Sequence, residues 1–332
     1  MTLDVLDPGL LSTIQDGGRP DWTYLGVPVG GACDPWSLAL ANRLLDLPAG
    51  TAALEATIVG PTLAVREATV IALAGADLGG IELATGRRLV PGRTYRVEAG
   101  TTLSFPGSSA GDARLYLALA GGIDVPHVLG SASTLPAASL GGHAGRALAA
   151  GDVIAAVPGG RAAAAVAGRI WPGPVGPPAD EHGALRFVRG PHAELLGPAA
   201  VAALVAEPWT VTSASDRMGA RLDGRSLPIA VGESVPSHGV PSGAIQVPPD
   251  GRPIILLADH QTTGGYPVVG VVISADLPAA GQLRPGAAVR LREVSLAAAG
   301  GALKAQRAAW ETAVASLAEA AGWDELWRSA GG

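Results

Sequence analysis

Two reactive side chains are almost absent from this sequence: it has one lysine, Lys304, and one cysteine, Cys33. Lys304 lies outside any Gly-rich loop, which excludes a P-loop and argues against a Schiff base on a core lysine. A single cysteine can form neither an internal disulfide nor a thiolate metal cluster. If ATP is used, we therefore expect another chain to help hold its phosphates.

Basic runs and long apolar runs are also missing. The net charge is −6, and without clustered basic residues the chain lacks the electrostatic footprint that nucleic-acid binding requires. It contains no apolar run long enough for a membrane helix. The N-terminus carries Asp4 and Asp7 where a signal peptide would carry Lys or Arg. We expect a cytoplasmic, soluble protein with no nucleic-acid or membrane partner.

What is abundant is apolar residues and turn formers. Of the 332 residues 48% are hydrophobic, and 47 glycines and 27 prolines accompany them, which predicts a large core built from many short elements. Turn signals recur at the spacing of a β-barrel or sandwich, and Thr13–Arg19 is predicted to be a polar loop. The predicted strands of the first half are Ala53–Ile58, Thr62–Val65, Thr69–Ala74, Arg88–Val90, Thr94–Val97, Thr102–Phe105, Arg114–Ala120 and Val153–Val157.

Helix signals are few and divide the chain. Asp34 as N-cap and Pro35 after it predict a helix to about Leu45, and a terminal helix or helix pair over Ala302–Arg328 is expected to break at Gly322. Pro158–Glu181 is rich in Pro and Gly and predicts a linker. We predict a mainly β fold with two β modules, 1–175 and 176–295, and a helical extension, 296–332.

Polar side chains gather at one strand end in the second half. The apolar run that begins at Pro253 ends in five hydrogen-bonding residues, Asp259 to Thr263, while Gln246 and Tyr266 follow and precede neighbouring apolar stretches. Burying an unpaired polar group costs about 1–3 kcal/mol. A simple turn does not need so many polar side chains, so this stretch predicts a pocket.

Three other polar positions have a structural and a functional interpretation. Asp34 caps a helix, and helix N-termini also line anion sites. Asn42, a poor helix former among leucines, indicates a specific hydrogen bond that is either structural or directed at a ligand. Arg217 and Arg221 are a surface pair or a clamp for a carboxylate or phosphate. The six histidines show no close metal-binding spacing, and we predict no metal site.

Several phrases resemble one family in order along the chain. They are Thr13–Arg19 (TIQDGGR), Gly26–Asp34 (GVPVGGACD), Leu40–Leu44 (LANRL), Ala53–Thr57 (ALEAT), Gly121–Pro126 (GGIDVP), Ser215–Gly219 (SDRMG), Gly243–Gly251 (GAIQVPPDG) and Leu257–Pro267 (LADHQTTGGYP). The chain resembles the biotin-dependent carboxyltransferase-like proteins. That family includes the C subunit of bacterial 5-oxoprolinase, KipA, proteins named allophanate hydrolase subunit 2, and part of urea carboxylase.

The resemblance implies cyclophilin-like β-barrels for the two modules and a cleft completed by a KipI-like B subunit. It favours the C subunit of an ATP-dependent 5-oxoprolinase, in which a lactam-utilisation A subunit joins them and ATP with Mg serves the complex. The open alternatives are the carboxyltransferase part of a split biotin-dependent urea-type carboxylase and a KipA-like antagonist of a kinase inhibitor. Only the carboxylase would use biotin, carried on another chain.

Site residues carried over from the resemblance are divided by their chemistry. Asp259 is predicted to be the acid/base or orienting carboxylate, and Gln261 and Asn42 are the other predicted catalytic residues. The predicted substrate-binding residues are Asp34, Arg217, Gln246, Thr262 and Tyr266, with Arg217 holding an anionic group. His260 stands where the family commonly has Arg, so a charge beside Asp259 is expected to be missing at neutral pH.

Overall fold

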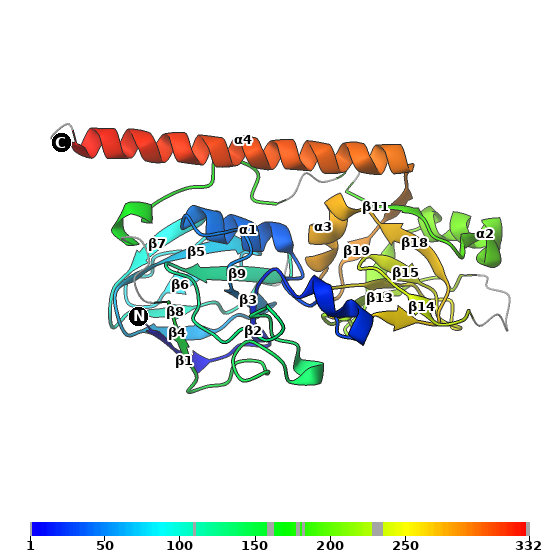
Figure 1. Cartoon of the computed structure of the whole chain (residues 1–332), viewed down its shortest axis with the longest axis horizontal. Helices are drawn as coiled ribbons and strands as arrows, with labels where there is room; N and C mark the ends of the chain where they lie inside the picture. The colour runs from blue at the N-terminus through cyan, green and yellow to red at the C-terminus, as the bar shows by residue number, and fades with distance from the viewer. Residues whose placement is uncertain are drawn as a thin grey trace.

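The computed structural model describes residues 2–108, 111–157, 163–176, 180, 183–227 and 235–329. The chain is mostly β, with short helices and one long C-terminal helix, so the predicted fold class is confirmed (Figure 1). No helix in the described ranges is both long and apolar enough to span a membrane. Parts of the predicted linker Pro158–Glu181 lie outside the described residues.

The first half forms two five-stranded antiparallel sheets over one core. One has the order β10-β1-β4-β8-β6 and the other β2-β3-β9-β5-β7. The strands are β1 (Thr2–Asp7), β2 (Ser12–Gln15), β3 (Ala53–Thr57), β4 (Thr62–Val65), β5 (Thr69–Gly75), β6 (Ile81–Glu82), β7 (Arg93–Val97), β8 (Thr102–Ser104), β9 (Arg114–Leu119) and β10 (Val153–Ala155). Buried residues of both sheets, such as Leu63 and Leu117, share a single cluster.

Two predictions in this half were wrong. Arg88–Val90 is not a strand, because only an isolated bridge joins Ile81 to Arg88. Thr13–Gln15, the start of the predicted polar loop Thr13–Arg19, belongs to the buried strand β2. Hydrogen bonds offset part of the cost of this burial: the Gln15 amide N–H₂ donates to the Thr13 hydroxyl at 3.0 Å and to the Thr134 carbonyl at 3.1 Å.

The second half is an eight-stranded sheet that nearly closes into a barrel. Its order is β19-β12-β13-β16-β15-β18-β11-β20, and a two-stranded ribbon, β14-β17, lies beside it. The strands are β11 (Leu185–Arg189), β12 (Trp209–Val211), β13 (Gly219–Asp223), β14 (His238–Gly239), β15 (Ala244–Gln246), β16 (Ile254–Leu256), β17 (Thr263–Gly264), β18 (Val268–Val272), β19 (Ala288–Val289) and β20 (Leu291–Glu293). The outermost strands, β19 and β20, are separated only by Arg290, so the two edges lie together.

The helices cover the sheets and connect them. They are η1 (Pro20–Leu25), α1 (Pro35–Leu44), η2 (Pro136–Ala138), η3 (Ala163–Val166), α2 (Ala193–Ala206), η4 (Ser274–Asp276), α3 (Leu277–Gly281) and α4 (Leu296–Ser329). α1 begins as predicted: the Asp34 carboxylate accepts from the backbone N–H of Ser37 at 3.0 Å, and Pro35 takes the first turn. Among the described residues, strands pair only within each half; the module boundaries at 175 and 295 stay a prediction.

Of the predicted helix or helix pair, the terminal segment is a single helix, and the break expected at Gly322 is absent. α4 continues through Gly322 to Ser329 and runs alongside both halves (Figure 1). A helical glycine costs about 1 kcal/mol relative to alanine, which the surrounding helix formers offset. α4 is anchored where Gln306 donates to the Ala275 carbonyl at 2.8 Å and where Trp310 meets Trp36 and Trp171, with ring centroids 5.0 and 5.1 Å apart.

We expect Trp310→Ala to lower the free energy of unfolding by about 2 kcal/mol. The estimate lies below the range for a fully buried tryptophan because this ring is half-buried. Urea denaturation followed by circular dichroism measures it, with Arg307→Ala, an exposed position one turn earlier on α4, as the matched control. Equal stability of the two variants would contradict the anchoring role of the tryptophan cluster.

Candidate functional site

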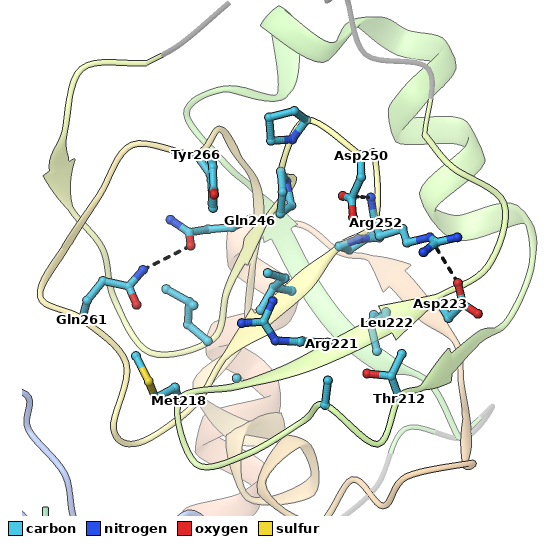
Figure 2. A pocket seen from close by; sticks show the side chains of 17 residues that line it. Thr212, Met218, Arg221, Leu222, Asp223, Gln246, Asp250, Arg252, Gln261 and Tyr266 are labelled. Atoms are coloured by element: carbon cyan, nitrogen blue, oxygen red, sulfur yellow. Dashed lines mark hydrogen bonds and ion pairs between the residues drawn. The ribbon is translucent and has the colours of Figure 1, made fainter. Parts of the chain in front are cut away.

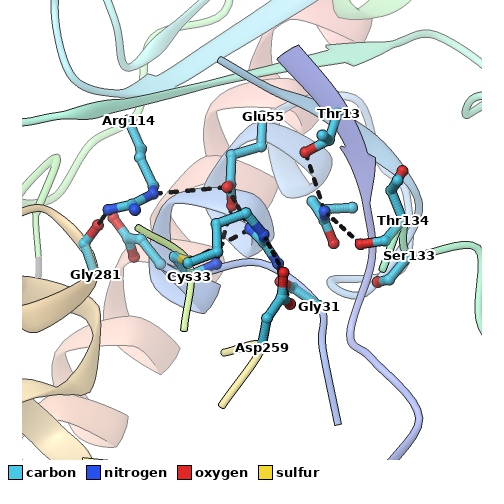
Figure 3. Close-up of polar contacts among 12 residues, drawn as sticks. Thr13, Gly31, Cys33, Glu55, Arg114, Ser133, Thr134, Asp259 and Gly281 are labelled. Atoms are coloured by element: carbon cyan, nitrogen blue, oxygen red, sulfur yellow. Dashed lines mark hydrogen bonds and ion pairs between the residues drawn. The ribbon is translucent and has the colours of Figure 1, made fainter. Parts of the chain in front are cut away.

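A buried guanidinium, that of Arg217, lies where the two halves meet. Its partners Gly31, Cys33, Glu55 and Asp259 are labelled in Figure 3. Its Nε and Nη2 donate to the two carboxylate oxygens of Asp259 at 2.8 and 2.9 Å. Nη2 also donates to the Gly31 carbonyl at 2.6 Å, while Nη1 reaches Glu55 Oε1 and lies 3.3 Å from the Cys33 sulfur. An arginine side chain has five N–H donors, and here all five have acceptors within the protein.

Glu55, in the first half, is the carboxylate to which Arg217 donates there. Besides Arg217, its carboxylate accepts from the Tyr116 hydroxyl at 2.6 Å and from the Cys33 backbone N–H at 3.0 Å, and Arg114 Nε lies 3.6 Å away. Complete burial alone would raise the pKa of Glu55, but the two arginines and these hydrogen bonds hold it below its ordinary value. Glu55 is therefore an ionised carboxylate, and the network holds two cations against two anions.

Strand pairing positions the side chains of this network. Glu55 in β3 is registered opposite Tyr116 in β9, so both point to the same face. On the other side, Arg217 lies just before β13, separated from it by Met218, and Asp259 lies in the turn after β16; β13 pairs with β16. The Asp259 N–H donates to the Arg217 carbonyl at 2.9 Å, which fixes the spacing of the two side chains.

A third buried carboxylate, Asp34, lies next to this network. It accepts from the Ser37 hydroxyl at 2.5 Å and from Gln282 Nε2 at 2.7 Å, and its backbone N–H donates to the Tyr116 hydroxyl at 2.8 Å. Burial raises the pKa of Asp34, against the opposing effect of Ser37 and Gln282. Asp34, predicted to bind substrate, here caps α1 and contacts the loop after α3 through Gln282.

Three predicted residues line a cavity of about 790 Å³ on the outside of the second barrel (Figure 2). Gln246, Gln261 and Tyr266 contribute to its wall, and the Gln261 amide donates to Gln246 Oε1 at 3.4 Å. The buried Nε2 of Gln246 has no hydrogen-bond partner within the described ranges. Arg221 lines the same cavity, and no ion pair engages its guanidinium in the part of the chain that the structure describes.

Other charged groups around this cavity already have partners. Arg252 forms an ion pair with Asp223 at 3.2 Å. Asp250 accepts from the backbone N–H of Arg252 at 3.1 Å within its own turn. Arg221 is thus the cation of this wall that is available to an incoming anion.

A second cavity, of about 710 Å³, lies between η1 and the strand ends of the second half. Thr262, a predicted substrate-binding residue, lines it together with His260 and Ser242. Burial lowers the pKa of His260, opposed by its hydrogen bond to Gln261 and by the charge of Asp259. The imidazole is neutral at pH 7, as expected for the missing charge beside Asp259.

The predicted site residues are therefore distributed over four places. Arg217 was predicted to hold an anion of the substrate, but the anions it holds are the protein's own, Asp259 and Glu55. Asn42 lies apart from the cavities: its amide donates to the carbonyls of Ala49 and Thr51, at 3.1 and 2.7 Å, in the loop after α1. These contacts favour the structural interpretation of Asn42 over the ligand-directed one.

Sequence reasoning missed the first-half partners of the network. Glu55 lies inside a short apolar strand, where a carboxylate is costly without a cation. Arg114 and Tyr116 alternate along β9, whose six residues are all buried. A charged residue inside a strand with no polar face was the available signal. In the described residues, no group of three or more His, Cys, Asp or Glu side chains is arranged to hold a metal ion.

Comparison with known proteins defines the class to which this fold and site belong. Residues 25–293 match the family described as carboxyltransferase domain, subdomain A and B, and the chain belongs to that family. It is 34% identical over 304 residues to the C subunit of 5-oxoprolinase from Escherichia coli, covering 89% of this chain and 92% of the relative. It is 32% identical over 329 residues to urea amidolyase of Lachancea kluyveri, covering 93% of this chain but 18% of the relative.

Solved structures give the same picture. The crystal structure of the protein TTHA0988 matches with a TM-score of 0.75 and 35% identity, over 89% of this chain and 55% of that one. K. lactis urea amidolyase matches with a TM-score of 0.82 and 28% identity, over 95% of this chain and 20% of that one. This chain thus spans about half of TTHA0988 and a fifth of the amidolyase.

We expect Arg217→Met to lower the free energy of unfolding by about 3–5 kcal/mol, because it leaves Asp259 and Glu55 buried without their main cation. Urea denaturation measures the loss. Arg221→Met, four residues away on the exposed face, removes the same charge without a buried partner and should change stability by no more than about 0.5 kcal/mol. A small effect of Arg217→Met would show that the network does not hold the halves together.

The Cys33 thiol makes the free energy of unfolding fall at alkaline pH. Burial raises the pKa of its thiol to about 11, against the opposing effect of Arg114 and Arg217. Above pH 9 the unfolded chain loses this proton while the folded chain keeps it, so the free energy of unfolding falls as pH rises from 9 to 11. The thiol contributes a slope of up to about 1.4 kcal/mol per pH unit. Denaturation between pH 8 and 11 should show a steeper decline for the wild type than for Cys33→Ala; parallel declines would contradict this.

Proposed function

We propose that this chain is the C subunit of an ATP-dependent 5-oxoprolinase that converts 5-oxo-L-proline to L-glutamate with a KipI-like B subunit and a lactam-utilisation A subunit. The observation that carries the proposal is how fully the match covers the C subunit of 5-oxoprolinase. The match to the C subunit of 5-oxoprolinase covers 92% of the relative in both Escherichia coli and Haemophilus influenzae, whereas the amidolyases contain the same region as a small part of a longer polypeptide.

In this proposal the lactam occupies the cavity of Figure 2. Arg221 in β13 and Gln246 in β15 are both registered opposite Ile254 in β16. Residues in one such row share a face of the sheet, so Ile254 forms a floor with a guanidinium on one side and a carboxamide on the other. 5-Oxoproline carries a carboxylate and a lactam carbonyl, which are the two acceptors that these groups would bind.

The remaining polar groups complete the binding site. The unpartnered Nε2 of Gln246 supplies a donor for the lactam carbonyl oxygen, and Gln261 holds the Gln246 amide in orientation by donating to its Oε1. Tyr266 is half exposed at the rim, where its ring covers the bound lactam. Asp259 acts as an orienting carboxylate: through Arg217 it fixes the turn from which Gln261 projects.

ATP belongs to the complex in this proposal and not to this chain alone. With one lysine and no P-loop, the chain has no dedicated phosphate cradle. The described residues likewise offer no clustered carboxylates for Mg²⁺. ATP would activate the amide oxygen of a lactam that is otherwise stable, and the residues above would bind and orient the lactam for that step.

The second candidate is carboxyl transfer to a urea-like amide, with biotin and ATP on other chains. It is favoured by the structural match to urea amidolyase over 95% of this chain. Urea is uncharged, so it has no group for Arg221 to pair with. The charge of the cavity therefore favours the lactam.

The test is ATP-dependent glutamate release from 5-oxo-L-proline by the complex formed on co-expression with the two partner subunits. We expect Arg221→Gln to raise KM about tenfold or more with little change in kcat, because a hydrogen bond between charged groups contributes about 1.5–3 kcal/mol to binding. Arg252→Gln is the matched control, since that arginine lines the same cavity but is paired with Asp223.

Two outcomes would count against the proposal in different ways. An intact complex with no glutamate release would reject the oxoprolinase function, and biotin-dependent assays with urea-like amides would follow. An active complex whose KM is unchanged by Arg221→Gln would keep the function and reject this cavity as the site of the substrate carboxylate.

A further inference from the structure

The second cavity contains a hydrogen-bonded serine and histidine that the function proposed above does not use. Ser242 Oγ lies 3.1 Å from His260 Nε2, and His260 Nδ1 lies 2.6 Å from the Gln261 carbonyl oxygen. A carbonyl can only accept, so Nδ1 carries the proton of the neutral ring. Nε2 is then the acceptor, and the Ser242 hydroxyl donates to it.

The imidazole is held in the tautomer and orientation of a general base. The Gln261 carbonyl fixes its far nitrogen, as the third member does in a nucleophile–base–orienter arrangement. The His260 backbone N–H donates to the Leu257 carbonyl at 3.2 Å, so the residue belongs to the turn that follows β16. The side chain is buried, and its unprotonated nitrogen is directed at a hydroxyl.

The serine is presented by a tight turn. The Ala244 N–H donates to the Pro241 carbonyl at 3.2 Å, which places Ser242 and Gly243 at the two central positions. Gly243 has φ +81°, and a Cβ there would lie 2.7 Å from the Leu277 side chain and 3.1 Å from the Val272 carbonyl oxygen. Only glycine fits this position. Packing against these residues therefore fixes the turn that carries the hydroxyl.

The cavity around this pair differs chemically from the cavity of Figure 2. Its lining comes from η1 and the following loop in the first half and from the β14–β15 and β16–β17 segments in the second. The lining residues are Thr23, Tyr24, Gly26, Val29, Gly239, Val240, Pro241, Ser242, His260, Thr262 and Thr263. They include no Arg, Lys, Asp or Glu, so the wall suits an uncharged ligand of mixed apolar and hydroxyl character and offers nothing to a carboxylate.

We propose that Ser242 and His260 form a nucleophilic acyl-transfer site for small uncharged acyl compounds, esters in the first place. The Ser242 oxygen forms a bond to the acyl carbon while its proton passes to His260 Nε2. The carbon–oxygen bond to the leaving alcohol breaks, and the alcohol takes that proton. Water then attacks the acyl-serine with His260 again accepting a proton, which returns to Ser242 as the carboxylic acid leaves. The site needs no other co-reactant, and it stands independently of the oxoprolinase assignment.

The experiment uses the purified full chain and two probes, p-nitrophenyl acetate for turnover and diisopropyl fluorophosphate for covalent labelling. Peptide mapping by mass spectrometry should place a single phosphoryl label on Ser242. A positioned general base contributes about 10²–10⁴-fold to such a step. We therefore expect p-nitrophenolate release to fall by about 100-fold or more in Ser242→Ala and in His260→Gln, each compared at equal folded concentration by circular dichroism.

Ser237→Ala is the matched control. This serine is exposed on the same half and lies outside the cavity lining, and its removal should leave both labelling and turnover at wild-type levels. An unlabelled Ser242 in the wild-type chain would overturn the proposal whatever the variants do. So would turnover that Ser242→Ala or His260→Gln does not reduce, since the pair would then be a structural hydrogen bond.

Discussion

The two halves of this protein depend on one buried guanidinium. Arg217 directs all its donors at the protein and so binds a strand of the first half, through Glu55, to a strand end of the second, through Asp259. Opposite charges removed from water are stable only when each is paired and hydrogen-bonded. The relative position of the halves is therefore fixed at the point from which the polar turn, Asp259 to Thr263, extends.

The side chains of that turn line two cavities of different chemistry. Gln261 faces a cavity with an available arginine, while His260 and Thr262 face a cavity lined without charged residues. These three residues are consecutive in the sequence, so one short stretch serves both cavities. An anionic lactam and a neutral acyl compound would therefore be recognised by neighbouring residues without competing for space.

Much of the fold could be predicted because short apolar strands and turn residues recur regularly, and Asp34 with Pro35 marks the start of α1. The continuity of α4 and the nature of Ser12–Gln15 could not. In α4 the surrounding helix formers outweigh Gly322, and in Ser12–Gln15 tertiary partners such as Thr134 pair a polar side chain. The stretch from Gln246 to Tyr266 was identified as a pocket from local polarity alone. Its separation into two cavities, and the pairing of Arg217 with Glu55, depend on contacts between residues far apart in sequence.

The strand order also dictates when each half is complete during synthesis. In the first half the final strand, β10, pairs with β1, Thr2 lying opposite Ala155. In the second half β20 pairs with β11, Leu291 lying opposite Leu185. Each unit therefore acquires its last strand only when its C-terminal end leaves the ribosome. The N-terminal unit can fold first, with Glu55 and Arg114 side by side. Until the second unit is made, these two residues form a partly charged surface, which Arg217 and Asp259 then cover.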